Sequence, residues 1–143
     1  MILIADCGST KIDWCLIDGN NIEKQVFTCG MNAVMLSEEE IRLRIAEELL
    51  PELGTLAASV DAVFFYGAGC ISPEVCGNVS RALKANLPSA ANVEVYSDLL
   101  AAARALCGHQ SGIACILGTG SNSCFYDGRE IVANVSPLGF ILG

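Results

Sequence analysis

Short apolar runs open the chain, and polar turns rich in glycine separate them. Ile2–Ala5, Ile12–Ile17 and Ile22–Thr28 have the length of strands. The first run is apolar throughout, as expected for a strand that is buried on both faces. The turns between the runs are Gly8-Ser9-Thr10 and Asp18-Gly19-Asn20-Asn21. The pattern predicts three strands in a meander.

Helical spacing replaces this pattern in the next segment. Ser37, followed three residues later by Glu40, predicts a capping box at a helix N-terminus. An apolar stripe then recurs at helical intervals up to Pro51, and it consists of Ile41, Ile45 and Leu49. We therefore expect one helix that ends at the proline.

Two strand–helix units come next. Residues 61–66 are rich in β-branched and aromatic side chains, and Ser72-Pro73 starts a helix with proline at its first position. Val93–Tyr96 predicts a further strand, and Ser97-Asp98 opens an alanine-rich helix that Gly108 ends. The order β-β-β-α-β-α-β-α predicts an α/β fold, with a mixed sheet and helices on its faces.

The opening pattern then returns. A Gly118-Thr119-Gly120-Ser121 turn and a tight Asp127-Gly128 hairpin turn separate three expected strands, which are Ile113–Leu117, Ser123–Tyr126 and Glu130–Val135. In both copies a glycine–hydroxyl turn leads into a strand that ends at Asp-Gly, so the pattern is an internal repeat. We expect a complete domain at residues 1–109 and the opening meander of a second at 110–143, as in the front half of a longer protein.

Composition excludes several classes of protein. Apolar residues make up 52% of the 143 residues, which is too many for a disordered chain, yet no apolar run is long enough to span a bilayer. No basic region precedes the apolar start, so no signal peptide is expected. A net charge of −8, with eight Lys and Arg, argues against a nucleic-acid partner. The eight cysteines contain no C-x-x-C pair and are expected to be reduced thiols. We predict a cytoplasmic protein without membrane or nucleic-acid partners.

The two glycine–hydroxyl turns are the strongest candidates for a ligand site. Glycine lets a backbone approach a ligand closely, while successive N–H groups and hydroxyls donate to anionic oxygen. Two such turns that face each other would hold a polyphosphate from both sides. Each one taken alone is equally an ordinary hairpin turn.

Two charged residues flank the first turn. Asp6 ends a buried strand, where its carboxylate would hold Mg²⁺ or bond to the backbone of the next turn. Lys11 would neutralise phosphate or be a solvated turn lysine.

Three further positions carry possible chemistry. Asp98 begins a helix directly after a strand, so it is either a general base or a carboxylate that complements the helix dipole. Asn32 would hydrogen-bond a polar substrate or belong to an ordinary loop. Gly67-Ala68-Gly69 would pass close to a ligand or simply turn the chain.

These motifs resemble those of a known superfamily. Asp6-Cys7-Gly8-Ser9-Thr10-Lys11 and Gly118-Thr119-Gly120-Ser121-Asn122 are similar to the two phosphate motifs shared by actin, sugar kinases and heat-shock chaperones. Together with Gly30-Met31-Asn32 and residues 97–103, they most closely resemble the BadF/BadG/BcrA/BcrD ATPase family, in particular its N-acetylglucosamine-kinase-like members. The resemblance covers nearly the whole chain.

The resemblance implies a ribonuclease-H-like domain that pairs with a second one across an ATP cleft, in a homodimeric sugar kinase. It implies that Asp6 organises Mg²⁺, that Asp98 is the general base, and that the sugar is contacted by Asn32, Gly67, Gly69 and Asp98. The implied ATP-phosphate ligands are Gly8, Ser9, Thr10, Lys11, Thr119, Gly120, Ser121 and Asn122.

The chain departs from the family pattern in two places. Gly67-Ala68-Gly69 stands where the amino-sugar kinases tend to have Ser-Gly-Gly. The chain also ends before an Asp-Glu-Gly-Ser stretch and the adenosine-binding half. We therefore expect the chain alone to have little or no kinase activity.

Three other functions stay open at this point. One is an ATPase that activates a dehydratase or reductase through an iron–sulfur cluster shared between subunits. Another is a ribonuclease-H-type nuclease that uses Asp6 and Asp98 as metal ligands. The third is a transcriptional regulator on a sugar-kinase scaffold, which needs a DNA-binding module that we do not expect ahead of a strand beginning at residue 2.

Overall fold

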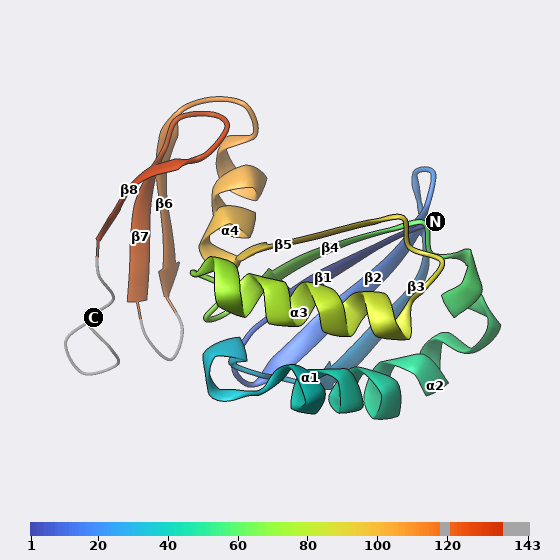
Figure 1. Ribbon diagram of the computed structural model, residues 1–143. Coiled ribbons are helices and arrows are strands. Elements are labelled where there is room, and N and C mark those ends of the chain that lie inside the picture. The colour runs from blue at the N-terminus through green and yellow to red at the C-terminus, as the bar shows by residue number, and fades with distance from the viewer. Residues whose placement is uncertain (118–120, 136–143) are drawn as a thin grey trace. The chain divides into compact units, whose positions relative to one another are not determined.

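The predicted opening meander is present in the computed structural model, which describes residues 1–117 and 121–135. Strands β1 (Ile2–Cys7), β2 (Lys11–Asp18) and β3 (Asn21–Cys29) are antiparallel neighbours. Strands β4 (Ala62–Gly67) and β5 (Asn92–Ser97) extend the sheet in parallel with β1, in the order β3-β2-β1-β4-β5 (Figure 1). The mixed sheet expected from the sequence is thereby confirmed.

Helical segments connect these strands. They are the 3₁₀ turn η1 (Ala33–Met35), α1 (Glu38–Arg44), the π-helical turn η2 (Ile45–Leu49), α2 (Leu50–Leu53), the 3₁₀ helix η3 (Gly54–Ser59) and α3 (Pro73–Asn86). The capping box is formed as predicted, because Ser37 Oγ accepts from Glu40 N at 3.2 Å and Ser37 N donates to Glu40 Oε2 at 2.9 Å.

The first helical segment continues past Pro51, where the sequence predicts its end. Pro51 stands in the first turn of α2, directly after the π-helical turn. A proline inside an α-helix lacks an N–H and its ring collides with the carbonyl four residues earlier. The wider π turn changes the spacing to that carbonyl, so the proline is accommodated and the helix reaches Leu53.

One face of the five-stranded sheet packs against α1 and α3 (Figure 1). Side chains alternate along each strand, so that Leu3, Ala5 and Cys7 of β1 are buried on this face. Trp14 is fully buried there and lies 5.8 Å from the Phe65 ring, measured between centroids. Asp6 and its alternate neighbours therefore lie on the opposite face.

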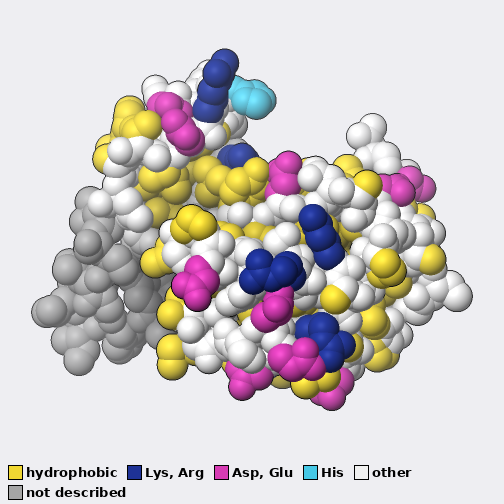
Figure 2. Space-filling model, in the orientation of Figure 1, with side chains coloured by type: hydrophobic (Ala, Val, Ile, Leu, Met, Phe, Trp, Pro, Cys, Tyr) yellow, Lys and Arg dark blue, Asp and Glu magenta, His cyan; other side chains and the backbone are white. Residues whose placement is uncertain are grey.

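Charged side chains of both signs lie next to one another over α1 and α3 (Figure 2). Arg81 of α3 pairs with Glu38 of α1, and Arg42 pairs with Glu39. This face therefore shows no separate basic patch. Among the described residues, every helix is too short or too polar to cross a membrane.

The second unit repeats the meander. Helix α4 (Asp98–Cys107) packs on β6 (Gly112–Leu117) and β7 (Ser121–Tyr126), and β8 (Ile131–Val135) completes an antiparallel sheet in the order β6-β7-β8. Its core consists of Leu99, Ala103, Ala114, Cys124 and Tyr126. The Asp127-Gly128 turn is wider than expected, since Asp127 N bonds to Glu130 O at 3.1 Å.

The boundary between the two compact units falls between Ser97 and Asp98 in the chain. Helix α4 falls in the second unit because its buried side chains pack with β6 and β7. The sequence-based domains, 1–109 and 110–143, stay a prediction.

Candidate functional site

Three parallel strands end side by side at one edge of the larger sheet. Cys7 of β1 is in register with Gly67 of β4, and Gly67 is in register with Ser97 of β5. Ligands of open α/β sheets bind outside the carboxyl ends of such strands. Asp6 lies next to the end of β1 and Gly67 ends β4, so predicted residues of the first unit gather where this fold places ligands. Asp98 follows β5 in the chain but belongs to the second unit.

The first turn, Gly8–Lys11, joins β1 to β2. Its backbone is closed by a hydrogen bond from Gly8 N to Lys11 O of 2.9 Å. Ser9, Thr10 and Lys11 are exposed. The Lys11 ammonium lies 5.2 Å from the centroid of the Phe27 ring. Because an exposed cation–π contact is worth only about 0.5–1 kcal/mol, an anionic ligand has little to overcome in drawing Lys11 away.

Two carboxylates oppose each other across β1 and β2. Asp6 pairs in register with Asp13, and the Asp13 carboxylate accepts from Gln25 Nε2 at 2.9 and 3.1 Å. Like charges directly opposite in a sheet destabilise it, and a divalent cation would offset the repulsion. Mg²⁺ binds through one or two carboxylates plus phosphate oxygens, so this donor set fits it. No group of three or more metal-binding side chains occurs in residues 1–117 and 121–135.

The sequence analysis does not single out Asp13. The residue lies inside a strand, where an isolated carboxylate carries no motif. Only the pairing register, which depends on the turn between β1 and β2, brings it opposite Asp6.

A short bracing segment, Cys29–Met31, supports the first turn. Gly30 N donates to Thr10 O at 3.0 Å, and Met31 N donates to Gly8 O at 3.2 Å. The segment therefore contacts the turn along its backbone rather than through side chains.

The bracing segment leads directly to Asn32. The Asn32 side chain caps η1 by accepting from Val34 N at 3.1 Å. It also lies against the loop after β4, because a Cβ on Gly69 would stand 2.3 Å from Asn32 Oδ1. That loop is tied to β1 by a hydrogen bond of 2.9 Å from Ala68 N to Cys7 O. The structure thus brings together the first turn, Asn32 and the Gly67–Gly69 loop.

Packing alone accounts for both glycines of that loop. A Cβ on Gly67 would lie 2.6 Å from Phe65 Cε1 and 2.9 Å from Cys70 Sγ. Gly69 has a φ of +80°, which side chains rarely adopt, and Asn32 fills the adjacent space. Their predicted contact with a substrate stays a prediction.

The second turn, residues 118–122, is described only in part. Thr119 and Gly120 lie outside the described residues, and Ser121 begins β7. The Asn122 side-chain oxygen is buried and finds no partner among the described residues. Buried polar atoms are nearly always hydrogen-bonded. The Asn122 oxygen could therefore accept a hydrogen bond from a water or a ligand. The predicted convergence of the two turns stays a prediction.

Asp98 is the half-buried first residue of α4. At that position a carboxylate complements the partial positive charge of the helix N-terminus. The position is compatible with both interpretations made from the sequence, and its role as a base stays a prediction.

A solved structure closely resembles the whole chain. It is a candidate N-acetylglucosamine kinase from Porphyromonas gingivalis, 52% identical, with a TM-score of 0.94. The match covers 100% of this chain and 50% of that one, so the chain spans half the length of that protein. The chain belongs to this N-acetylglucosamine-kinase-like family. The resemblance and the ribonuclease-H-like fold expected from the sequence are thereby confirmed.

Other similarities are distant. A ROK hexokinase from Thermus thermophilus is 17% identical with a TM-score of 0.47, over 92% of this chain and 48% of that chain. A PPX-GPPA enzyme from Aquifex aeolicus is 18% identical with a TM-score of 0.48, over 96% and 52%. No protein-family model and no curated protein matches the chain.

The eight cysteines all lie within the described residues and are reduced thiols rather than disulfides. Burial raises the pKa of Cys15, Cys76 and Cys124, and the charge of Asp13 raises the pKa of Cys15 further. Since the thiolate is the reactive form, a raised pKa makes these three thiols poor nucleophiles at neutral pH.

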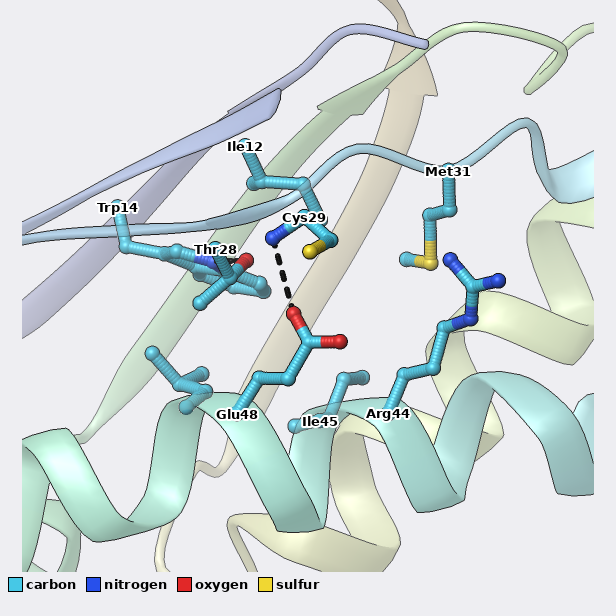
Figure 3. Close-up of a pocket in the computed structure, with 9 residues that line it drawn as sticks. Ile12, Trp14, Thr28, Cys29, Met31, Arg44, Ile45 and Glu48 are labelled. Carbon is cyan, nitrogen blue, oxygen red and sulfur yellow. Dashed lines mark hydrogen bonds between the residues drawn. The ribbon is translucent and has the colours of Figure 1, made fainter. Parts of the chain in front are cut away.

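Two further charged residues near the site escape the sequence analysis. Arg44 and Glu48 lie four residues apart on the first helical segment and reach the end of β3 (Figure 3). The space between them and the sheet holds only about 10 Å³, enough for about one water molecule. Their i,i+4 spacing is visible in the sequence, but which strand they face is not.

Proposed function

We propose that the natural protein containing this chain is an ATP-dependent kinase that phosphorylates a hydroxyl of an N-acetylhexosamine such as N-acetylglucosamine. Membership of the N-acetylglucosamine-kinase-like family supports the class of reaction. One observation supports the assignment of this function to residues of the first unit. The first turn and the segment leading to Asn32 are hydrogen-bonded at the carboxyl ends of β1 and β4.

The proposed nucleotide site uses both turns. Gly8, Ser9, Thr10 and Lys11 would hold phosphate oxygens from one side, and Thr119, Gly120, Ser121 and Asn122 from the other. Asp6, with Asp13 opposite, would hold Mg²⁺. When bound, ATP supplies the phosphoryl group and Mg²⁺ neutralises its charge. The open acceptor on Asn122 suits a hydroxyl or a metal-bound water better than a bare phosphate oxygen, since only the former donate.

The proposed sugar site lies beside it. Asn32 would bind the sugar, with the loop Gly67–Gly69 as a second wall. Asp98 would accept the proton of the attacking hydroxyl as its oxygen bonds to phosphorus, and ADP would leave. Holding the two reactants in line is the larger part of such catalysis.

Two properties of the whole protein belong to the same proposal. Eight reduced cysteines suit a reducing compartment, so we place the protein in the cytoplasm. We further propose a homodimer, which light scattering on the full-length protein tests.

A transfer assay on the full-length gene product tests the function. We expect ATP-dependent release of ADP with N-acetylglucosamine, and loss of about 10²–10⁴-fold in kcat for Asp98→Asn with ATP affinity retained. Asp18→Asn is the matched control, because Asp18 lies at the end of β2 that is remote from the first turn. This variant should behave as wild type. Absence of transfer to any amino sugar or hexose would overturn the proposal, and full activity of Asp98→Asn would remove that residue from the mechanism.

A further inference from the structure

The first turn rests directly on the backbone of the bracing segment. A Cβ on Gly30 would lie 2.4 Å from Lys11 N, 2.4 Å from the Thr10 carbonyl carbon and 2.5 Å from that of Ser9. No side chain fits between the two segments, and the two hydrogen bonds described above join them. A displacement of Gly30 must therefore displace the turn.

Two charged side chains hold the bracing segment from its other side. Glu48 Oε2 accepts from Cys29 N at 2.9 Å (Figure 3), and Arg44 Nη1 donates to Gly30 O at 3.1 Å. Cys29 ends β3, which is an edge strand of the sheet. The two residues thus hold consecutive backbone positions at a place where no neighbouring strand can do so.

The geometry of the helix favours these two contacts with the backbone of the bracing segment. Glu48 lies in the π-helical turn that begins directly after Arg44. Such turns cost stability relative to an α-helix and occur often beside functional sites. The free space of about 10 Å³ beside the pair is too small for a ligand, so the charges act on the backbone.

We propose that Arg44 and Glu48 are positioning residues that set the first turn for polyphosphate binding without touching the ligand. The inference rests on the kinase function proposed above. It is distinct from a contribution to stability alone, because a shift of the turn weakens phosphate binding even in a protein that stays folded. Arg44 is exposed, so its replacement should be compatible with folding.

The test uses the full-length gene product and three variants. Arg44→Met removes the hydrogen bond to Gly30, and Arg44→Lys keeps a donor and should restore part of the effect. Arg42→Met is the matched control, because Arg42 lies on the same helix but pairs with Glu39 instead. We expect Arg44→Met to raise both the KM for ATP and its calorimetric Kd about tenfold, as for the loss of a charged hydrogen bond. Its kcat should stay near that of wild type.

Two results would overturn the inference. One is an unchanged Kd for ATP in Arg44→Met, and the other is an equal increase in Arg42→Met. Should Arg44→Met fail to fold, Glu48→Met takes its place, with Glu48→Gln, which keeps an acceptor for Cys29 N, as the rescuing variant.

A second readout separates this inference from the proposed function. Amide hydrogen exchange at Gly8, Gly30 and Met31, whose N–H groups make the hydrogen bonds that close and brace the turn, should be faster in Arg44→Met than in Arg42→Met when measured without nucleotide. If the wild-type protein binds no ATP, the kinase proposal fails, while this exchange still decides whether Arg44 holds the turn. Equal exchange in the two variants would show that it does not.

Discussion

Gly69 combines a left-handed backbone with a filled environment. Its φ is +80°, and a Cβ there would lie 2.3 Å from Asn32 Oδ1 and 2.9 Å from Val34 Cγ2. Gly19, in the turn between β2 and β3, has a φ of +60° but nothing within 4 Å of the same position. The two glycines share the backbone requirement and differ in the space around them.

Replacement by alanine should separate these two effects. We expect Gly19→Ala to lower the free energy of unfolding by about 1–2 kcal/mol, the usual cost of a left-handed residue with a Cβ. Gly69→Ala should cost about 1 kcal/mol more, because Asn32 has to give up its hydrogen bond to Val34 N. Urea denaturation of both variants measures the difference. Equal losses would mean that Asn32 moves aside freely, and would contradict its placement against this loop.

Asp127 gives the second unit a dependence on pH. Its carboxylate accepts from Glu130 N at 2.9 Å and Arg129 N at 2.8 Å, and these bonds hold its pKa below the ordinary value. Folding therefore favours the ionised form. The contribution is complete above the pKa of the unfolded chain, about 4, and is lost as pH falls through the lower pKa of the folded state.

The corresponding variant is Asp127→Asn. We expect wild type to have the higher Tm at pH 7 and the difference to shrink steadily below about pH 4, as the carboxylate of wild type becomes protonated. Thermal denaturation across pH measures it. A difference that is the same at pH 7 and at pH 3 would show that the charge of Asp127 is not what stabilises the turn.

The strands and most helices of the chain were predictable because local signals agree with their final environment. The apolar run at Ile2–Ala5 lies within β1, and the Ser37–Glu40 capping box starts α1. Asp98 starts α4 as the sequence indicates. In each case the pattern needs only its own side chains and neighbouring backbone to take effect.

The exceptions depend on contacts that are distant in sequence or on unusual local geometry. Pro51 predicts a helix end, but the π-helical turn accommodates it and carries Glu48 to the end of β3. The glycine–hydroxyl turn at Gly8 was predictable from its composition. The carboxylate opposite Asp6 was not, because Asp13 reaches that position only through the register of two strands.

The two units differ greatly in the size of their cores. Within the described residues, twenty-two buried residues form the core of the first unit. Five buried residues, packed between one helix and a three-stranded sheet, form that of the second. Since apolar burial is the main source of stability, the described part of the second unit has much less to hold it folded.

We therefore expect the second unit to open first. Amide hydrogens of β6 and β7 should exchange at a lower opening free energy than those of β1 and β4, as measured by native-state hydrogen exchange on this chain. Two matched substitutions sharpen the test, because Leu99 is 1% exposed in one core and Leu83 is 0% exposed in the other. Each change to alanine should cost about 2–5 kcal/mol. Leu99→Ala should accelerate exchange in β6 and β7 while leaving β1 and β4 unchanged, whereas Leu83→Ala should accelerate β1 and β4. Identical exchange energies in β1 and β6 of wild type would show instead that the chain opens as one cooperative unit, with stability shared between the two cores.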